Sequence, residues 1–92
     1  MRIETQILSN LINDETYVRK VIPFLKEEYF SDSEDRKVFT VIKEFVEKYN
    51  SPPNKSALLI NLQEDRTVTE DLYVKCETVI NSLRADKDTD AQ

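Results

Sequence analysis

The sequence predicts an all-α fold, a compact bundle of five to six short helices. The chain of 92 residues contains no glycine, so tight glycine-dependent hairpins are excluded. Its apolar residues recur at spacings of three and four, which is typical of amphipathic helices. The periodic stretches are interrupted by Asn, Asp and Pro, residues that cap or break helices. The length suits one small domain. We expect this domain to span residues 1–84 and residues 85–92 to form a polar tail or a truncated linker.

The first helix is expected over residues 2–12, on an apolar stripe of Ile3, Ile7, Leu8, Leu11 and Ile12. A second helix follows at once, with Asn13 or Asp14 as its N-cap, and Pro23 ends or bends it. A short helical turn then leads into Tyr29 and Phe30. With glycine absent, Asn13 and Asn50 are the residues expected to adopt the left-handed conformation at helix C-termini.

The strongest helix signal runs from Phe30 to Tyr49. Ser31, Asp32 and Ser33 can each accept a hydrogen bond from a free backbone amide, and Ser31 with Glu34 has the spacing of a capping box, which predicts the start of the helix. At about 100° per residue, one stripe of this helix collects its main apolar residues. These are Val38, Ile42, Phe45, Val46 and Tyr49, with Phe39 and Val41 beside them. We expect the other helices to cover this stripe.

The break at residues 50–53 contains two prolines and precedes a fourth helix, which ends near Leu62 and is capped by Asn54 or Ser51. Residues 63–68 read as a polar connection. Thr67 and Glu70 again have capping-box spacing, so the fifth helix is expected from there to about Leu83. Its apolar face comprises Leu72, Cys76, Val79, Ile80 and Leu83.

Composition excludes several functional classes. Without glycine there is no P-loop and no dinucleotide-binding loop. With no histidine and a single cysteine, a Cys/His zinc site, an internal disulfide and histidine-based nucleophile activation are excluded. The net charge of −5 argues against direct nucleic-acid binding by this segment. No apolar run is long enough to cross a membrane, and the N-terminus does not resemble a signal peptide.

Acidic residues gather before and within the start of the central helix: Glu27, Glu28, Asp32, Glu34 and Asp35. A calcium loop beginning at Asp32 fails, because its sixth and twelfth positions are Lys37 and Lys43. We interpret the cluster as solvated cap and helix-dipole residues rather than as a catalytic or metal site. Cys76 is expected to be a buried apolar group. Most of the aromatic residues have core spacing and are expected in the core rather than on a base-stacking surface. No cofactor, metal or catalytic residue is predicted.

One partner signal remains. Leu59 and Ile60 point away from the stripe of the fourth helix formed by Ala57, Leu58 and Leu62, and Val74 lies opposite the core face of the fifth helix. Contiguous exposed apolar residues mark interfaces, whereas scattered ones are ordinary surface. The sequence supports the two interpretations equally, and Leu59, Ile60 and Val74 are the candidate partner-binding residues.

The order of several patterns resembles a known family. Residues 4–14 read ETQILSNLIND, residues 21–30 read VIPFLKEEYF, and residues 36–42 read RKVFTVI. Together with the turn SPPN at residues 51–54, they resemble the N-terminal domain of DnaB-type replicative helicases, particularly the shorter helicases of T-even-like phages. The resemblance covers about residues 3–83.

This resemblance implies a structural role. In the family, this domain contributes to the collar of a hexameric ring and docks primase or helicase-loader proteins. ATP and Mg²⁺ are used by a separate ATPase domain, which the glycine-free chain does not contain. We therefore expect no enzymatic activity of its own. The expected partners are neighbouring helicase subunits, primase and loader, without nucleic acid or membrane, in the cytoplasm of a bacterial host.

Two alternatives stay open at this point. The chain could be a stand-alone helical adaptor or inhibitor that mimics the helicase or primase interaction domain. Continuation of the reading frame past Gln92 into a P-loop sequence would distinguish a helicase N-terminal domain from a stand-alone protein of this kind. A small enzyme is disfavoured by the lack of histidine and glycine.

Overall fold

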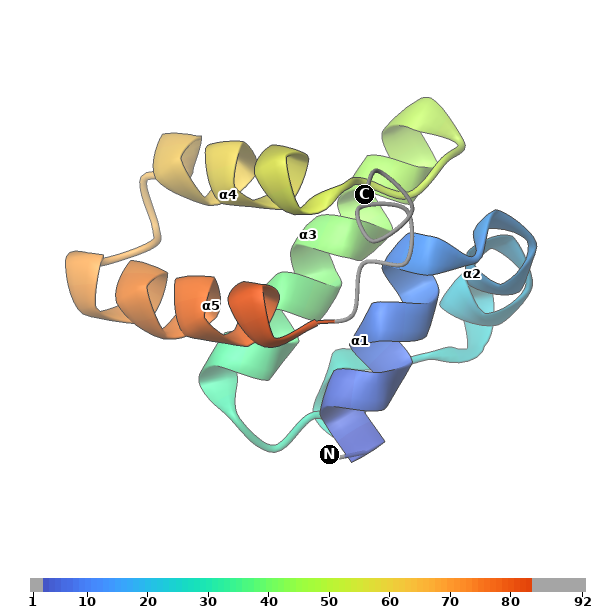
Figure 1. The fold of residues 1–92 in the computed structure, drawn as a ribbon, viewed down its shortest axis with the longest axis horizontal. Helices are drawn as coiled ribbons and strands as arrows, with labels where there is room; N and C mark the ends of the chain where they lie inside the picture. Colours follow the sequence, from blue (N-terminus) through green and yellow to red (C-terminus); the bar gives the residue numbers. More distant parts are fainter. Residues whose placement is uncertain (1–2, 84–92) are drawn as a thin grey trace, which may run out of the picture.

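In a computed structural model the structure describes residues 3–83, and this part of the chain contains helices and no strand (Figure 1). The α-helices are α1 (Ile3–Asn13), α2 (Glu15–Val21), α3 (Ser33–Tyr49), α4 (Lys55–Glu64) and α5 (Glu70–Ser82). Two short 3₁₀ turns, η1 (Ile22–Phe24) and η2 (Glu27–Tyr29), connect α2 to α3. The predicted all-α bundle is confirmed. The expected helix start at Arg2 and the tail over residues 85–92 lie outside the described residues.

Helix α3 is the centre of the fold. Helix α1 packs against one side of it, and α2 packs on α1. Helices α4 and α5 form an antiparallel pair that also packs on α3 (Figure 1). Every α-helix contributes buried apolar residues to a single core. Among those that are almost completely buried are Leu8, Leu11, Val18, Val38, Ile42, Leu58, Leu62, Cys76 and Ile80. The ring of Phe30 stacks on that of Phe39 with centroids 5.0 Å apart, which anchors the segment before α3 to this core.

Several predicted helix boundaries are confirmed by their caps. The Asp14 carboxylate accepts from the amide of Tyr17 at 2.9 Å, so Asp14 rather than Asn13 caps α2. The Asn54 side chain accepts from the amide of Ala57 at 2.8 Å, so Asn54 rather than Ser51 caps α4. The α-helical geometry of α2 ends at Val21, and Pro23 lies in η1, as its missing amide donor requires.

Both predicted capping boxes are wrong. Helix α3 begins at Ser33 with Asp32 as its N-cap, because Phe30 reaches the core and the chain stays extended as far as Asp32. Helix α5 is capped by Thr69, whose hydroxyl accepts from the amide of Leu72 at 3.1 Å. Thr67 belongs to the preceding turn. Its amide and its hydroxyl donate to Asp65 Oδ1 at 2.8 and 2.6 Å.

The C-terminus of α3 has the expected left-handed cap. Asn50 has φ 58°, the only positive φ among residues 3–83, and its amide donates to the carbonyl of Val46 at 2.7 Å. The same expectation for Asn13 is wrong. The chain passes directly from α1 into α2, and the amide of Asp14 bonds to the carbonyl of Asn10 at 3.0 Å, so no left-handed residue is needed.

The apolar stripe of α3 is confirmed only in part. Val38, Ile42 and Val46 are buried, but Phe45 is only half-buried and Tyr49 is 55% exposed. The last turn of α3 extends past the helices that cover the rest of it (Figure 1). Conversely, Phe39 and Val41, expected at the edge of the stripe, are buried. Ile3, at the open end of α1, is 72% exposed and is not a core residue.

Candidate interaction surface

The three predicted partner-binding residues differ in exposure. Leu59 is half-buried and packs against the core, so it is only partly available to a partner. Ile60 is 54% exposed and Val74 is 53% exposed. Ile60 lies two residues from both Leu58 and Leu62, which are buried, and therefore projects from the opposite side of α4. Val74 has the same relation to Cys76 on α5. The two residues lie on different helices, and each faces away from the core.

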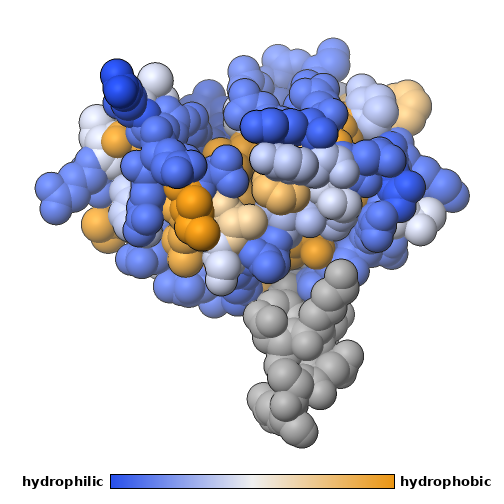
Figure 2. All heavy atoms as spheres, turned by 90° about the horizontal axis from the view of Figure 1, so that it is seen from above, coloured by the Kyte–Doolittle hydropathy of each residue, from blue (hydrophilic) through white to orange (hydrophobic). Residues whose placement is uncertain are grey.

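The surface over α4 is mixed in polarity. Seen from the upper side of Figure 1, small groups of apolar side chains alternate with polar ones, without one large apolar area (Figure 2). Small separate groups of this kind are common on protein surfaces. Any partner of this face therefore has to make polar as well as apolar contacts.

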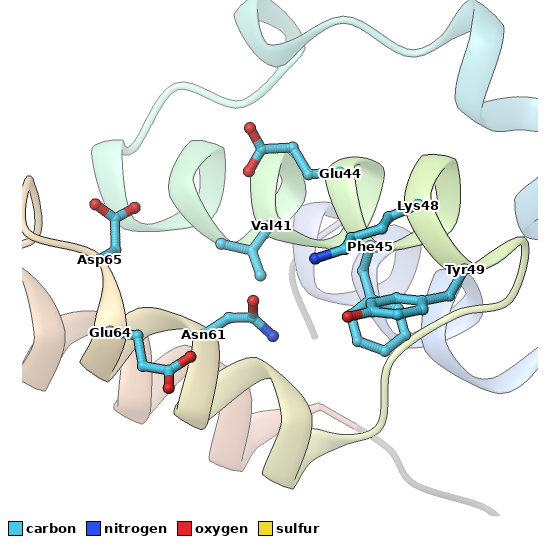
Figure 3. Close-up of a pocket in the computed structure, with 8 residues that line it drawn as sticks. All are labelled: Val41, Glu44, Phe45, Lys48, Tyr49, Asn61, Glu64 and Asp65. Carbon is cyan, nitrogen blue, oxygen red and sulfur yellow. The ribbon is translucent and has the colours of Figure 1, made fainter.

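A shallow groove of about 340 Å³ lies between α3 and α4. Its lining side chains are Val41, Glu44, Phe45, Lys48, Tyr49, Asn61, Glu64 and Asp65. In Figure 3, Val41 and Phe45 point from α3 toward α4, and Asn61 lies opposite them. The rings of Phe45 and Tyr49, with centroids 4.6 Å apart, close one end. Asp65 stands at the other end.

The polar groups at the two ends of the groove have partners. Lys37 Nζ donates to Asp65 Oδ2 at 2.6 Å, and this bond together with those from Thr67 lowers the pKa of Asp65 to about 2. At the aromatic end, Lys48 Nζ lies 5.2 Å from the centre of the Tyr49 ring, within the range of a cation–π contact. Glu44 and Glu64 line the groove from α3 and α4 respectively, and in Figure 3 the carboxylate of Glu44 points to the side of α3 away from α4.

The acidic cluster before and within the start of α3 does not form one solvated surface. Glu27, Glu28 and Asp32 are exposed and Glu34 is half-buried, but Asp35 is fully buried. The interpretation of Asp35 as a solvated dipole residue is therefore wrong, since its position in α3 faces the interior. Across residues 3–83, no group of three or more Asp, Glu, Cys or His side chains is arranged to hold a metal ion. No helix in the described part is long and apolar enough for a membrane span.

Cys76 is buried in the core as expected. Its Sγ lies 3.8 Å from the backbone carbonyl of Glu34. Burial, followed by the negative charge of Glu34, raises the pKa of the thiol to about 11. A thiol with a raised pKa is a poor nucleophile at neutral pH, because the thiolate is the reactive form.

Sequence reasoning missed the groove and the exposed aromatic residues. Phe24 is 77% exposed and Tyr29 is 58% exposed, although most aromatic residues were expected in the core. The groove was missed because Phe45 and Tyr49 have the spacing of core residues. The only available signal was the position of both residues in the last turns of a long helix that is followed by a proline-rich break.

These features define a small all-α domain whose candidate binding residues, Ile60, Val74 and those of the groove between α3 and α4, lie on its surface. A family model described as "DnaB-like helicase N terminal domain" matches residues 1–82. The chain is 39% identical over 77 residues to the "DnaB-like replicative helicase" of Enterobacteria phage T4, an alignment that covers 84% of this chain and 16% of the relative. No solved structure matches. The chain belongs to the family of DnaB-like helicase N-terminal domains. It spans about one sixth of the length of the T4 relative.

Proposed function

We propose that this domain is an assembly and docking module of a hexameric replicative DNA helicase. In this role it contributes to the ring collar through contacts with neighbouring subunits and offers an outer surface to primase or a helicase loader. The observation that supports the proposal most directly is the pair of outward-facing apolar residues on α4 and α5, Ile60 and Val74, in a domain of this family.

The proposal assigns binding, not chemistry, to this part of the protein. The family match covers the N-terminal domain, and ATP hydrolysis with Mg²⁺ is assigned to an ATPase domain elsewhere in the helicase. The site of action is the cytoplasm of a bacterial host, in keeping with the phage origin of the T4 relative. Contact with DNA is assigned to other parts of the ring, since the chain carries a net charge of −5.

The test is light scattering coupled to size-exclusion chromatography on the purified chain, alone and mixed with the primase from the same genome. We expect a complex with primase whose affinity falls at least about tenfold, or about 1.4 kcal/mol, in the variant Ile60→Ser/Val74→Ser. Both side chains are more than half exposed, so circular dichroism should stay helical. Leu59 is left unchanged because its half-buried side chain also supports the core.

The control is Ile3→Ser, which removes an apolar side chain at the start of α1 that is even more exposed, at 72%. It should bind primase as the unchanged chain does. Absence of any complex with primase, and of any self-association, would contradict the proposed function. Equal binding by the double variant would contradict only the assignment of Ile60 and Val74.

A further inference from the structure

We propose that the groove between α3 and α4 binds a basic amphipathic helix of a partner protein. This inference rests on the proposed docking function and specifies the chemistry of the partner. The apolar face of the bound helix lies on Phe45 and Tyr49, and Lys or Arg residues on both of its flanks reach Glu44 and Glu64. Ile60 and Val74 do not line the groove, and Glu64 lies one helical turn from Ile60 on α4.

The shape of the groove supports a helical occupant. Two helices, α3 and α4, form its walls, and a third helix can lie between such walls by packing its side-chain ridges into the space. The apolar floor is incompletely covered within this chain. Phe45 is half-buried and Tyr49 is 55% exposed, although both belong to the main apolar stripe of α3. A docked apolar side chain would complete the burial of this stripe.

The charges of the groove support a basic partner. The carboxylates of Glu44 and Glu64 make no ion pair or hydrogen bond within residues 3–83, so both are available to a partner. The third carboxylate, Asp65, already bonds to Lys37. Negative charge on both walls complements a helix that carries positive charge on both sides of its apolar stripe. The net charge of −5 adds long-range attraction for such a partner.

The charges of the groove differ between its two ends. Glu64 and Asp65 stand at one end, whereas Lys48 extends from the end at Tyr49 toward Phe45 (Figure 3). A helix carries partial positive charge at its N-terminus and partial negative charge at its C-terminus. The bound helix is therefore oriented with its N-terminus toward Asp65 and its C-terminus toward Lys48.

The experiment is a selection of displayed helical peptides, with all surface positions randomised, against the whole immobilised chain. The consensus peptide, labelled with fluorescein, then serves as the probe in fluorescence polarisation. The groove variant is Glu44→Lys/Glu64→Lys. The matched control is Glu4→Lys/Glu28→Lys, which changes the net charge equally at residues that do not line the groove. Circular dichroism confirms that both variants remain helical.

We expect enriched peptides with apolar residues at helical spacing and Lys or Arg on both flanks. Affinity for the consensus peptide should fall at least about tenfold in the groove variant and less than about twofold in the control. Enrichment of neutral or acidic peptides, no enrichment, or equal loss in both variants would overturn the proposal. So would self-association of the chain that only the groove variant abolishes, because the occupant would then be a second copy.

The outcome is separable from that of the proposed function. If the groove variant binds no basic helix while the chain still binds primase through Ile60 and Val74, only the groove inference fails. If the chain binds neither primase nor another subunit but the basic peptide binds at the groove, only the proposed function fails.

Discussion

Lys37 Nζ and Asp65 Oδ2 lie 2.6 Å apart and join the first half of α3 to the turn that follows α4. The two residues are 28 positions apart in the sequence, and their side chains are 21% and 28% exposed. The same carboxylate organises the turn through its bonds to Thr67. This contact fixes where the chain leaves α4 and begins its return along α5.

Replacing Asp65 by Asn should lower the free energy of unfolding by about 1 kcal/mol, since it removes a charged hydrogen bond but keeps an acceptor for Thr67. The measurement is urea unfolding followed by circular dichroism at neutral pH. The comparison variant is Asp71→Asn. Asp71 pairs with Lys75 at 3.5 Å on the open surface of α5, and its loss should change stability by less than about 0.5 kcal/mol. Equal effects would argue against the bridging role.

The same contact predicts that the free energy of unfolding falls at low pH. The pKa of Asp65 is about 2 in the folded chain, below its ordinary value of 3.8. The stabilisation is therefore complete above about pH 4 and is lost as the pH falls through 2. The difference in urea midpoint between the unchanged chain and Asp65→Asn should shrink over this interval. A difference that stays constant between neutral and strongly acidic conditions would rule out the ionised pair as its source.

The aromatic residues of α3 should differ strongly in their contribution to stability. Phe39 is 1% exposed and stacks on Phe30, so Phe39→Ala should cost about 3–5 kcal/mol. Tyr49 is 55% exposed, and Tyr49→Ala should cost less than about 1 kcal/mol. Melting temperatures from calorimetry provide the measurement. A large loss in Tyr49→Ala would mean that the end of α3 is covered more fully than the structure shows.

Asn50 tests the left-handed cap. Asn50→Gly should keep the stability within about 0.5 kcal/mol, because glycine adopts positive φ without steric cost. Asn50→Ala should destabilise by about 1 kcal/mol, since a Cβ without a compensating polar group is disfavoured at φ 58°. Thermal unfolding of the two variants, side by side, decides the matter. The reverse order of stability would contradict the assigned backbone conformation.

Cys76 should react slowly with thiol reagents in the folded chain. A rise in its pKa from 9.0 to about 11 reduces the thiolate fraction at about pH 8 roughly a hundredfold, and burial slows the reaction further. Absorbance-monitored labelling with a disulfide reagent, with and without denaturant, measures the difference. Rapid labelling without denaturant would show that the helices open around α5.

The sequence predicted the helices well because each has its own periodic stripe and its own stop signal. Asp14, Asn54 and Asn50 act locally, and their roles follow from residue type and spacing. The two capping boxes failed for a different reason. At Ser31, the local capping preference is outweighed by the packing of the neighbouring Phe30 on Phe39. At Thr67, it is outweighed by the turn around Asp65, which is bonded to Lys37.

The candidate surface was less predictable than the fold. Exposure of Ile60 and Val74 follows from helix phase, which the sequence contains. The groove cannot be predicted from helix phase, because it arises where α4 leaves the end of α3 partly uncovered. That depends on the angle between the two helices. Glu44 and Glu64 are far apart in the sequence, and no motif around either residue indicates that they line the same groove. Only the packing of the helices brings them to opposite rims.

The central position of α3 has a consequence for how freely the chain can diverge. Helices α1, α4 and α5 each rest on α3, whereas α2 contacts the remainder mainly through α1 and η1. A change of side-chain size on α3 must be accommodated by several neighbours at once, whereas a change on α2 needs an adjustment in few. Related sequences should therefore vary most in α2 and on the outer side of α4, where new binding preferences can arise without rebuilding the interior.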